Sequence, residues 1–143
     1  MNKRSQQYYP ELLKKCPTGI KGLDELTNGG LPQNRTSLII GGPGCGKTVF
    51  SMEFLLHGIK EFKEPGVMVS FEEDRESLYA NFASMGNNLQ ELVEKKMLYI
   101  EEFNLLQKDI METGDFNLDP VFLRLEYAIR KIGAKRVVLD TID

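Results

Sequence analysis

The 143-residue chain has no tryptophan, one histidine and two cysteines, and these absences exclude several classes of protein. Cys16 and Cys45 form no CxxC pair, and with His57 as the single histidine they cannot supply a structural zinc site. Two distant cysteines also argue against a disulfide framework, so we expect a reducing compartment, the cytoplasm. No apolar run approaches the roughly 20 residues of a membrane helix, and no signal peptide follows the basic start.

Neither basic nor acidic residues are in large excess. The 18 Lys+Arg and 21 Asp+Glu residues give a net charge of −3, which argues against nucleic acid as a partner, because dedicated nucleic-acid-binding domains are basic. The apolar fraction of 41% and charged fraction of 27% are those of an ordinary folded domain. The sequence stops directly after the apolar run 137–139, so we expect a fragment of a longer protein.

Strand-like apolar runs alternate with helical stripes along the chain. Strands are predicted at 36–40, 67–71, 97–103 and 136–140. Helices are predicted at 47–62, 74–85, 89–95 and 120–132, with Asp119 as the N-cap of the last and Gly133 at its end, a short helical turn after Thr18, and mainly loop at 104–117. This alternation predicts an α/β fold with a parallel central sheet and helices on both faces. Residues 1–16 are polar and basic, which predicts a flexible tail.

Residues 41–48, GGPGCGKT, match the phosphate-loop pattern G-x-x-x-x-G-K-[ST]. The glycines let successive backbone N–H groups converge on an anion at a helix N-terminus. Lys47 can reach the β- and γ-phosphates, and the Thr48 hydroxyl can bind Mg²⁺. Because the motif follows a predicted strand and precedes a predicted helix, we predict a nucleotide site. Cys45 inside it is either a small residue that fits or a thiol activated by the helix N-terminus.

Carboxylates follow two of the predicted strands at the edge where α/β sheets bind ligands. Asp140 ends an apolar strand and is a candidate for holding a phosphate-bound Mg²⁺, although an ordinary strand-end aspartate would look the same. Glu72 and Glu73 could polarise the water that attacks the γ-phosphate, or they could simply begin an acidic helix. His57 is interpreted as a structural or surface residue.

Four segments together carry a more specific resemblance. GLDELTNGGLP, SLIIGGPGCGKTVFSMEFL, EPGVMVSFEE and IGAKRVVLDTID, in this order and spacing, resemble the KaiC family of RecA-like ATPases, to which the circadian-clock ATPase of cyanobacteria belongs. The resemblance runs from Cys16 to Asp143, and the GCGK form looks closer to the non-cyanobacterial relatives. It implies that 17–143 form the N-terminal part of a RecA-like P-loop NTPase domain, incomplete because it is truncated after the Walker B strand.

The resemblance also assigns roles to residues and partners. It implies a cytoplasmic homohexamer with ATP and Mg²⁺ bound between subunits. The paired catalytic glutamates of the family fall on Glu72 and Glu73, and its Walker B aspartate falls on Asp140. Ser84 matches a position near the nucleotide base. The phosphate-loop positions fall on Gly42, Pro43, Gly44, Cys45, Gly46, Lys47 and Thr48, and Val49 continues them.

Other implications concern the complete protein. Family members have two tandem ATPase domains, Ser/Thr autokinase activity and clock or signalling partners. In RecA-like folds the strand after Walker B lies between that strand and the phosphate-loop strand. Its absence here would leave 38–40 and 137–139 separated by an unfilled slot.

Three alternative functions compete with this interpretation. A GTPase would need DxxG and NKxD motifs, and the sequence has neither. A RecA-type DNA-acting ATPase shares the fold, and only the acidic balance weighs against it. An ATP sensor that assembles without hydrolysis would not need the Glu72-Glu73 pair.

Overall fold

The computed structural model describes residues 13–103 and 118–140. Within these ranges no helix is long and apolar enough to cross a membrane. The predicted loop 104–117 lies outside the described residues, as do residues 1–12 of the predicted tail and residues 141–143.

Three parallel strands form the central sheet in the order β4-β3-β5. The middle strand is β3 (Gly66–Ser70), and all five of its residues are buried. It is flanked by β4 (Leu98–Glu102) and β5 (Arg136–Asp140), and Ser70 pairs in register with Asp140. A strand that is covered on both faces has a nearly uninterrupted apolar sequence, which is why β3 is recognisable in the sequence. The predicted parallel sheet is confirmed.

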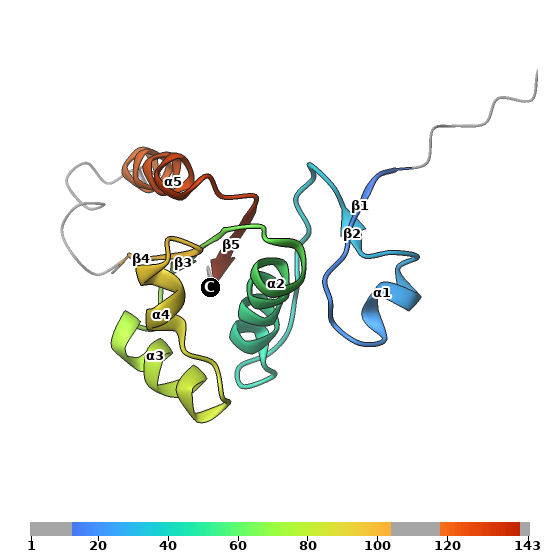
Figure 1. Cartoon of the computed structure of the whole chain (residues 1–143), viewed down its shortest axis with the longest axis horizontal. Coiled ribbons are helices and arrows are strands. Elements are labelled where there is room, and N and C mark those ends of the chain that lie inside the picture. Colours follow the sequence, from blue (N-terminus) through green and yellow to red (C-terminus); the bar gives the residue numbers. More distant parts are fainter. Residues whose placement is uncertain (1–12, 104–117, 141–143) are drawn as a thin grey trace, which may run out of the picture.

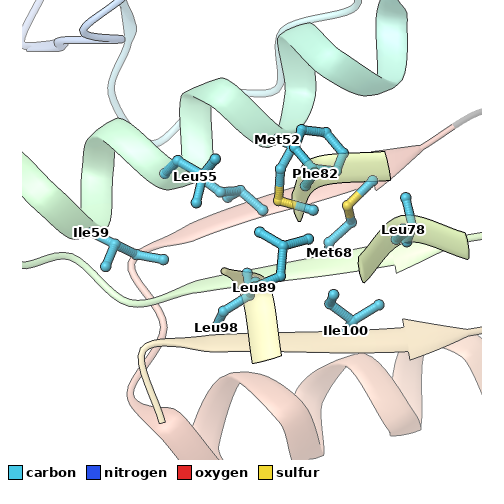
Figure 2. Close-up of a cluster of buried hydrophobic side chains, with 10 residues drawn as sticks. Met52, Leu55, Ile59, Met68, Leu78, Phe82, Leu89, Leu98 and Ile100 are labelled. Atoms are coloured by element: carbon cyan, nitrogen blue, oxygen red, sulfur yellow. The ribbon is translucent and has the colours of Figure 1, made fainter. Parts of the chain in front are cut away.

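One face of the sheet is covered by α2 (Lys47–Phe62), with α3 (Arg75–Ser84) and α4 (Leu89–Glu94) also on this side (Figure 1). The bounds of α2 are those predicted from its apolar stripe. Figure 2 shows the side chains of this core between the helices and the strands. The buried residues are Met52, Leu55, Leu56, Ile59, Met68, Leu78, Phe82, Leu89, Leu98 and Ile100.

The opposite face is covered by α5 (Asp119–Ile132), which packs on β3 and β4 (Figure 1). Side chains of successive strand residues point to opposite faces, so Val67 and Val69 face α5 whereas Met68 faces α2. The residues buried on the α5 side are Val67, Val69, Phe103, Val121 and Ala128. Helices on both faces of the sheet are therefore confirmed.

The predicted N-cap of α5 is wrong, whereas its predicted C-terminal end is correct. Leu118, not Asp119, is the N-cap, and Asp119 is already helical. The shift is possible because Pro120 has no N–H to lose and is tolerated in the first turn. Gly133 ends the helix as predicted, with a left-handed φ of 64°.

A small N-terminal unit precedes the sheet. It consists of β1 (Lys15–Cys16), α1 (Leu23–Leu26) and β2 (Leu31–Pro32), with β1 and β2 antiparallel. Lys15 and Cys16 are thus paired in a strand, so the predicted flexible tail 1–16 is wrong at these two residues. The pairing needs Leu31 and Pro32, fifteen and more positions away, so the local composition of the tail did not reveal it.

Asp24 stabilises the turn between β1 and α1 in this unit. Its carboxylate accepts hydrogen bonds from the Thr18 N–H at 2.9 Å, the Thr18 hydroxyl at 2.7 Å and the Gly19 N–H at 2.9 Å. Burial alone would raise the pKa of Asp24, but these hydrogen bonds, with help from Arg136, hold the pKa below its ordinary value.

The predicted strand at 36–40 is wrong for this structure. The segment forms no strand, and Leu38 and Ile40 are 81% and 85% exposed. Val137 and Leu139 of β5 are also exposed, on the face of the sheet where α5 packs on β3 and β4. An apolar β-branched run becomes a strand only where another strand can satisfy its N–H and C=O groups, and within 13–103 and 118–140 no strand pairs with it.

Candidate phosphate-binding and hydrolysis site

The phosphate loop leads directly into α2. Gly44 and Gly46 have φ values of 74° and 89°, which a residue with a Cβ adopts only with strain. Gly46 is the N-cap of α2, and Lys47 and Thr48 are its first two residues. These two glycines therefore let the chain turn sharply into the N-terminus of α2.

The N-terminus of α2 suits an anion. Its N-cap has no side chain to accept the first N–H groups, and its first turn contains no acidic residue. Those N–H groups and the helix dipole leave a local positive potential that phosphate oxygens can satisfy. Cβ atoms built at Gly42, Gly44 or Gly46 would meet nothing within 4 Å, so the space beside the loop is open.

Lys47 lies over this loop. Its Nζ donates to the carbonyl oxygens of Gly41 at 2.7 Å and Gly42 at 3.3 Å. An ammonium group has three donors, so one remains for a ligand. Cys45 is exposed, and Val49 in the first turn of α2 is 38% exposed.

Asp140 ends β5 on the same side of the sheet as α2. Val138 packs in the core beneath α2, and side chains alternate along a strand, so Asp140 faces α2 as well. Its register partner Ser70 is on the same face, and both side chains are almost fully buried. In Figure 2 Met52 lies nearer the arrowheads of the strands than Ile59 does, so α2 begins at this carboxyl edge.

Glu72 and Glu73 follow β3 at that edge, and the chain remains tied to β5 by the Phe71 N–H donating to the Asp140 carbonyl oxygen at 3.4 Å. Glu73 is half-buried, and its carboxylate accepts from Asn81 Nδ2 at 3.0 Å. Glu72 is exposed and, within the described part of the chain, has no hydrogen bond or ion pair. The structure therefore places the two candidate carboxylates in different environments.

Ser84 is the last residue of α3, and its hydroxyl donates to the Asn81 carbonyl oxygen at 2.6 Å. Within residues 13–103 and 118–140 this hydroxyl makes no hydrogen bond to the phosphate loop, so its role near a base stays a prediction. Sequence analysis did not single out Ser70 or Asn81, both of which contact Glu73. A polar residue ending a buried apolar strand could have indicated Ser70, whereas an exposed helical asparagine gives no signal.

The donor set fits a magnesium-bound phosphate rather than a metal cage built from protein alone. Within the described ranges no three His, Cys, Asp or Glu side chains could jointly hold a metal ion. Mg²⁺ at phosphate sites needs only one or two protein oxygens, with water and phosphate completing its octahedron. A hydroxyl at the start of α2 and a carboxylate at the end of β5 supply that number.

This chain is similar to known proteins over most of its length. A protein-family model described as "ATPase: KaiC" matches residues 16–143. Circadian clock protein KaiC2 of Synechocystis sp. is 55% identical over 131 residues, covering 92% of this chain and 23% of the relative. Circadian clock oscillator protein KaiC of Parasynechococcus marenigrum is 48% identical over 130 residues, covering 91% and 25%. That of Thermostichus vulcanus is 43% identical with the same coverage. The chain spans about a quarter of the length of these curated relatives.

Proposed function

The chain belongs to the KaiC family of ATPases, and we propose that it binds ATP with Mg²⁺ at residues 42–49 and hydrolyses it. The observation that carries the proposal is that groups suited to phosphate and groups suited to a metal ion and water lie at the same edge of the sheet. The uncapped N-terminus of α2 offers N–H donors and Lys47, and Asp140 and the Glu72-Glu73 pair follow the strands that end there. Cations for phosphate and carboxylates for metal and water are the parts that phosphoryl transfer to water requires.

Binding rests on the loop and the two metal-binding candidates. The N–H groups of residues 44–48 and Lys47 hold the β- and γ-phosphates, and Thr48 with Asp140 holds Mg²⁺. When bound, the ion neutralises charge that develops on the phosphates. Ser84 is proposed to lie toward the nucleotide base.

Hydrolysis rests on the glutamates. A carboxylate positioned beside the attacking water accepts its proton, a contribution typically worth about 10²–10⁴ in rate. Glu72 and Glu73 are the candidates because they closely follow the buried central strand β3 and are themselves exposed and half-buried, respectively.

For the complete protein we propose a cytoplasmic homohexamer with ATP at the subunit interfaces, Ser/Thr autokinase activity, and a circadian or related signalling role with clock or signalling proteins as partners. The names of the similar proteins support the clock role. Light scattering of the complete protein with and without ATP tests assembly. A monomer at saturating ATP would refute the hexamer.

The first test of the site concerns binding. Lys47→Ala removes a charge-assisted contact worth about 1.5–3 kcal/mol, so the Kd for ATP should rise about ten- to a hundredfold. Lys60→Ala is the matched control. It removes an exposed lysine of the same helix, and the Nζ of that lysine donates to Asn87 Oδ1 instead. Equal ATP affinity in the two variants would refute the binding site.

The second test concerns chemistry. The double variant Glu72→Gln with Glu73→Gln should bind ATP normally and hydrolyse it at least a hundredfold more slowly, because an amide cannot take the proton. Glu76→Gln, an exposed glutamate in the first turn of α3, is the control and should hydrolyse ATP at the wild-type rate. Wild-type turnover in the double variant would refute the assignment of the base.

A further inference from the structure

Glu73 is held at its main chain by the last residue of the central strand. The Ser70 hydroxyl donates to the Glu73 carbonyl oxygen at 2.6 Å and accepts from the Glu73 N–H at 3.2 Å. Ser70 is 2% exposed and lies in the middle of the sheet, so this anchor is rigid. The backbone of Glu73 is therefore fixed relative to β3 and to its register partner β5.

The side chain of Glu73 is held separately, by Asn81. The Asn81 Nδ2 donates to Glu73 Oε2 at 3.0 Å across two turns of α3. This part of α3 is itself fixed, because the neighbouring Phe82 and Leu78 are buried in the core and Asp74 caps the helix by accepting from the Ser77 N–H at 2.7 Å. The bond leaves the second carboxylate oxygen of Glu73 free to accept from another donor.

Helix stability does not explain an asparagine at position 81. Asparagine is a poorer helix former than alanine, by up to about 0.7 kcal/mol in a helix interior, and Asn81 is exposed. Its amide makes one side-chain hydrogen bond to another side chain, and that bond goes to a candidate catalytic carboxylate. An exposed residue that costs helix propensity and holds a carboxylate at a ligand-binding edge is typical of a positioning role.

We propose that Asn81 is a positioning residue for ATP hydrolysis, acting by holding the Glu73 carboxylate in its working orientation. The inference rests on the proposed function. Without the amide donor the glutamate side chain rotates among several rotamers, so the attacking water is correctly oriented for a smaller fraction of the time. The proposed nucleotide contacts come from the loop, from α2 and from Ser84. The Ser84 hydroxyl donates to the backbone carbonyl oxygen of Asn81, which a substitution at position 81 retains.

The test compares Asn81→Ala with Asn81→Asp and Asn81→Gln in the complete protein. Asn81→Ala should lower kcat about tenfold, leave the Kd for ATP within twofold, and leave the melting temperature unchanged or higher. Asn81→Asp keeps the shape but replaces the donor by an acceptor, so it should be at least as slow. Asn81→Gln keeps the amide and should recover part of the rate. Asn87→Ala is the matched control, since Asn87 binds Lys60 instead, and it should keep the wild-type kcat.

A Glu73→Ala background shows whether the effect passes through Glu73. There Asn81→Ala should change single-turnover hydrolysis by less than twofold. If Asn81→Ala alone hydrolyses ATP like the wild type, or if it still slows the Glu73→Ala protein tenfold, the positioning role is overturned while the proposed ATPase stands. A wild-type protein that binds ATP without hydrolysing it would overturn the ATPase and the positioning role with it.

Discussion

Replacing Gly58 by alanine tests how firmly the buried Arg136 is held. A Cβ at position 58 would lie 2.4 Å from Arg136 Nε and 2.5 Å from its Cδ. The Arg136 side chain is 1% exposed, its Nε donates to Glu64 Oε2 at 2.7 Å, and its Nη1 donates to the Phe54 carbonyl oxygen at 3.0 Å. The guanidinium also lies over the rings of Phe54 and Phe62, 4.6 and 5.2 Å from their centres.

Two opposing effects decide the outcome. Glycine to alanine inside a helix stabilises it by about 1 kcal/mol. Against this, moving the guanidinium gives up a charged hydrogen bond of about 1.5–3 kcal/mol, and overpacking a core costs about 1–3 kcal/mol. The losses exceed the gain, so Gly58→Ala should lower the free energy of unfolding by about 1.5–5 kcal/mol.

The measurement is urea denaturation of the complete protein followed by far-UV circular dichroism. Arg136→Ala provides the control background, because it removes both the guanidinium and the Cδ atom that the new Cβ would approach. In that background Gly58→Ala should stabilise the protein by up to about 1 kcal/mol. Stabilisation by Gly58→Ala in the wild type would refute the argument that Arg136 is immobile.

Three further predictions concern the core, the N-terminal turn and the loop thiol. Phe82→Ala should cost about 3–5 kcal/mol in urea denaturation because Phe82 is 1% exposed, whereas Phe122→Ala, at 55% exposed, should change stability by less than about 0.5 kcal/mol. Asp24→Asn should cost about 1–2 kcal/mol at pH 7, since its amide would face the Gly19 N–H. The pKa of Asp24 is lower in the folded protein than in the unfolded chain, so this stabilisation is present above about pH 4 and is lost as the pH falls through the folded pKa. If Asp24→Asn costs the same free energy of unfolding at pH 7 and at pH 2.5, the argument is contradicted. Alkylation of Cys45 in a Cys16→Ser protein should block ATP binding measured by calorimetry, and normal binding would show that the thiol lies outside the phosphate site.

The elements that the sequence predicted well are those whose signal is local. The stripe of α2 and the apolar run of β3 are each sufficient to define an element, because burial on one face or on both faces leaves a period in the sequence. The run at 36–40 carries the same local signal, yet Leu38 and Ile40 are exposed. Whether such a run becomes a strand depends on a neighbouring strand, which local sequence does not encode. The prediction for Lys15–Cys16 failed for the converse reason. This polar segment forms a strand because Leu31 and Pro32 pair with it, and its own composition gives no sign of that pairing.

The same distinction separates the parts of the candidate site. The candidate phosphate loop is readable from the sequence because its glycines, Lys47 and Thr48 lie in one short motif. Asp140 becomes a candidate because the strands of a parallel sheet end at one edge. The difference between Glu72 and Glu73 could not be predicted, because alternation along a strand shows only that neighbours diverge. What distinguishes them is a bond from Asn81, which depends on how α3 packs after the chain has left the sheet. Candidate phosphate-binding groups are thus readable from spacing, whereas a group proposed to orient a candidate catalytic side chain depends on the packing of a second element and requires the structure.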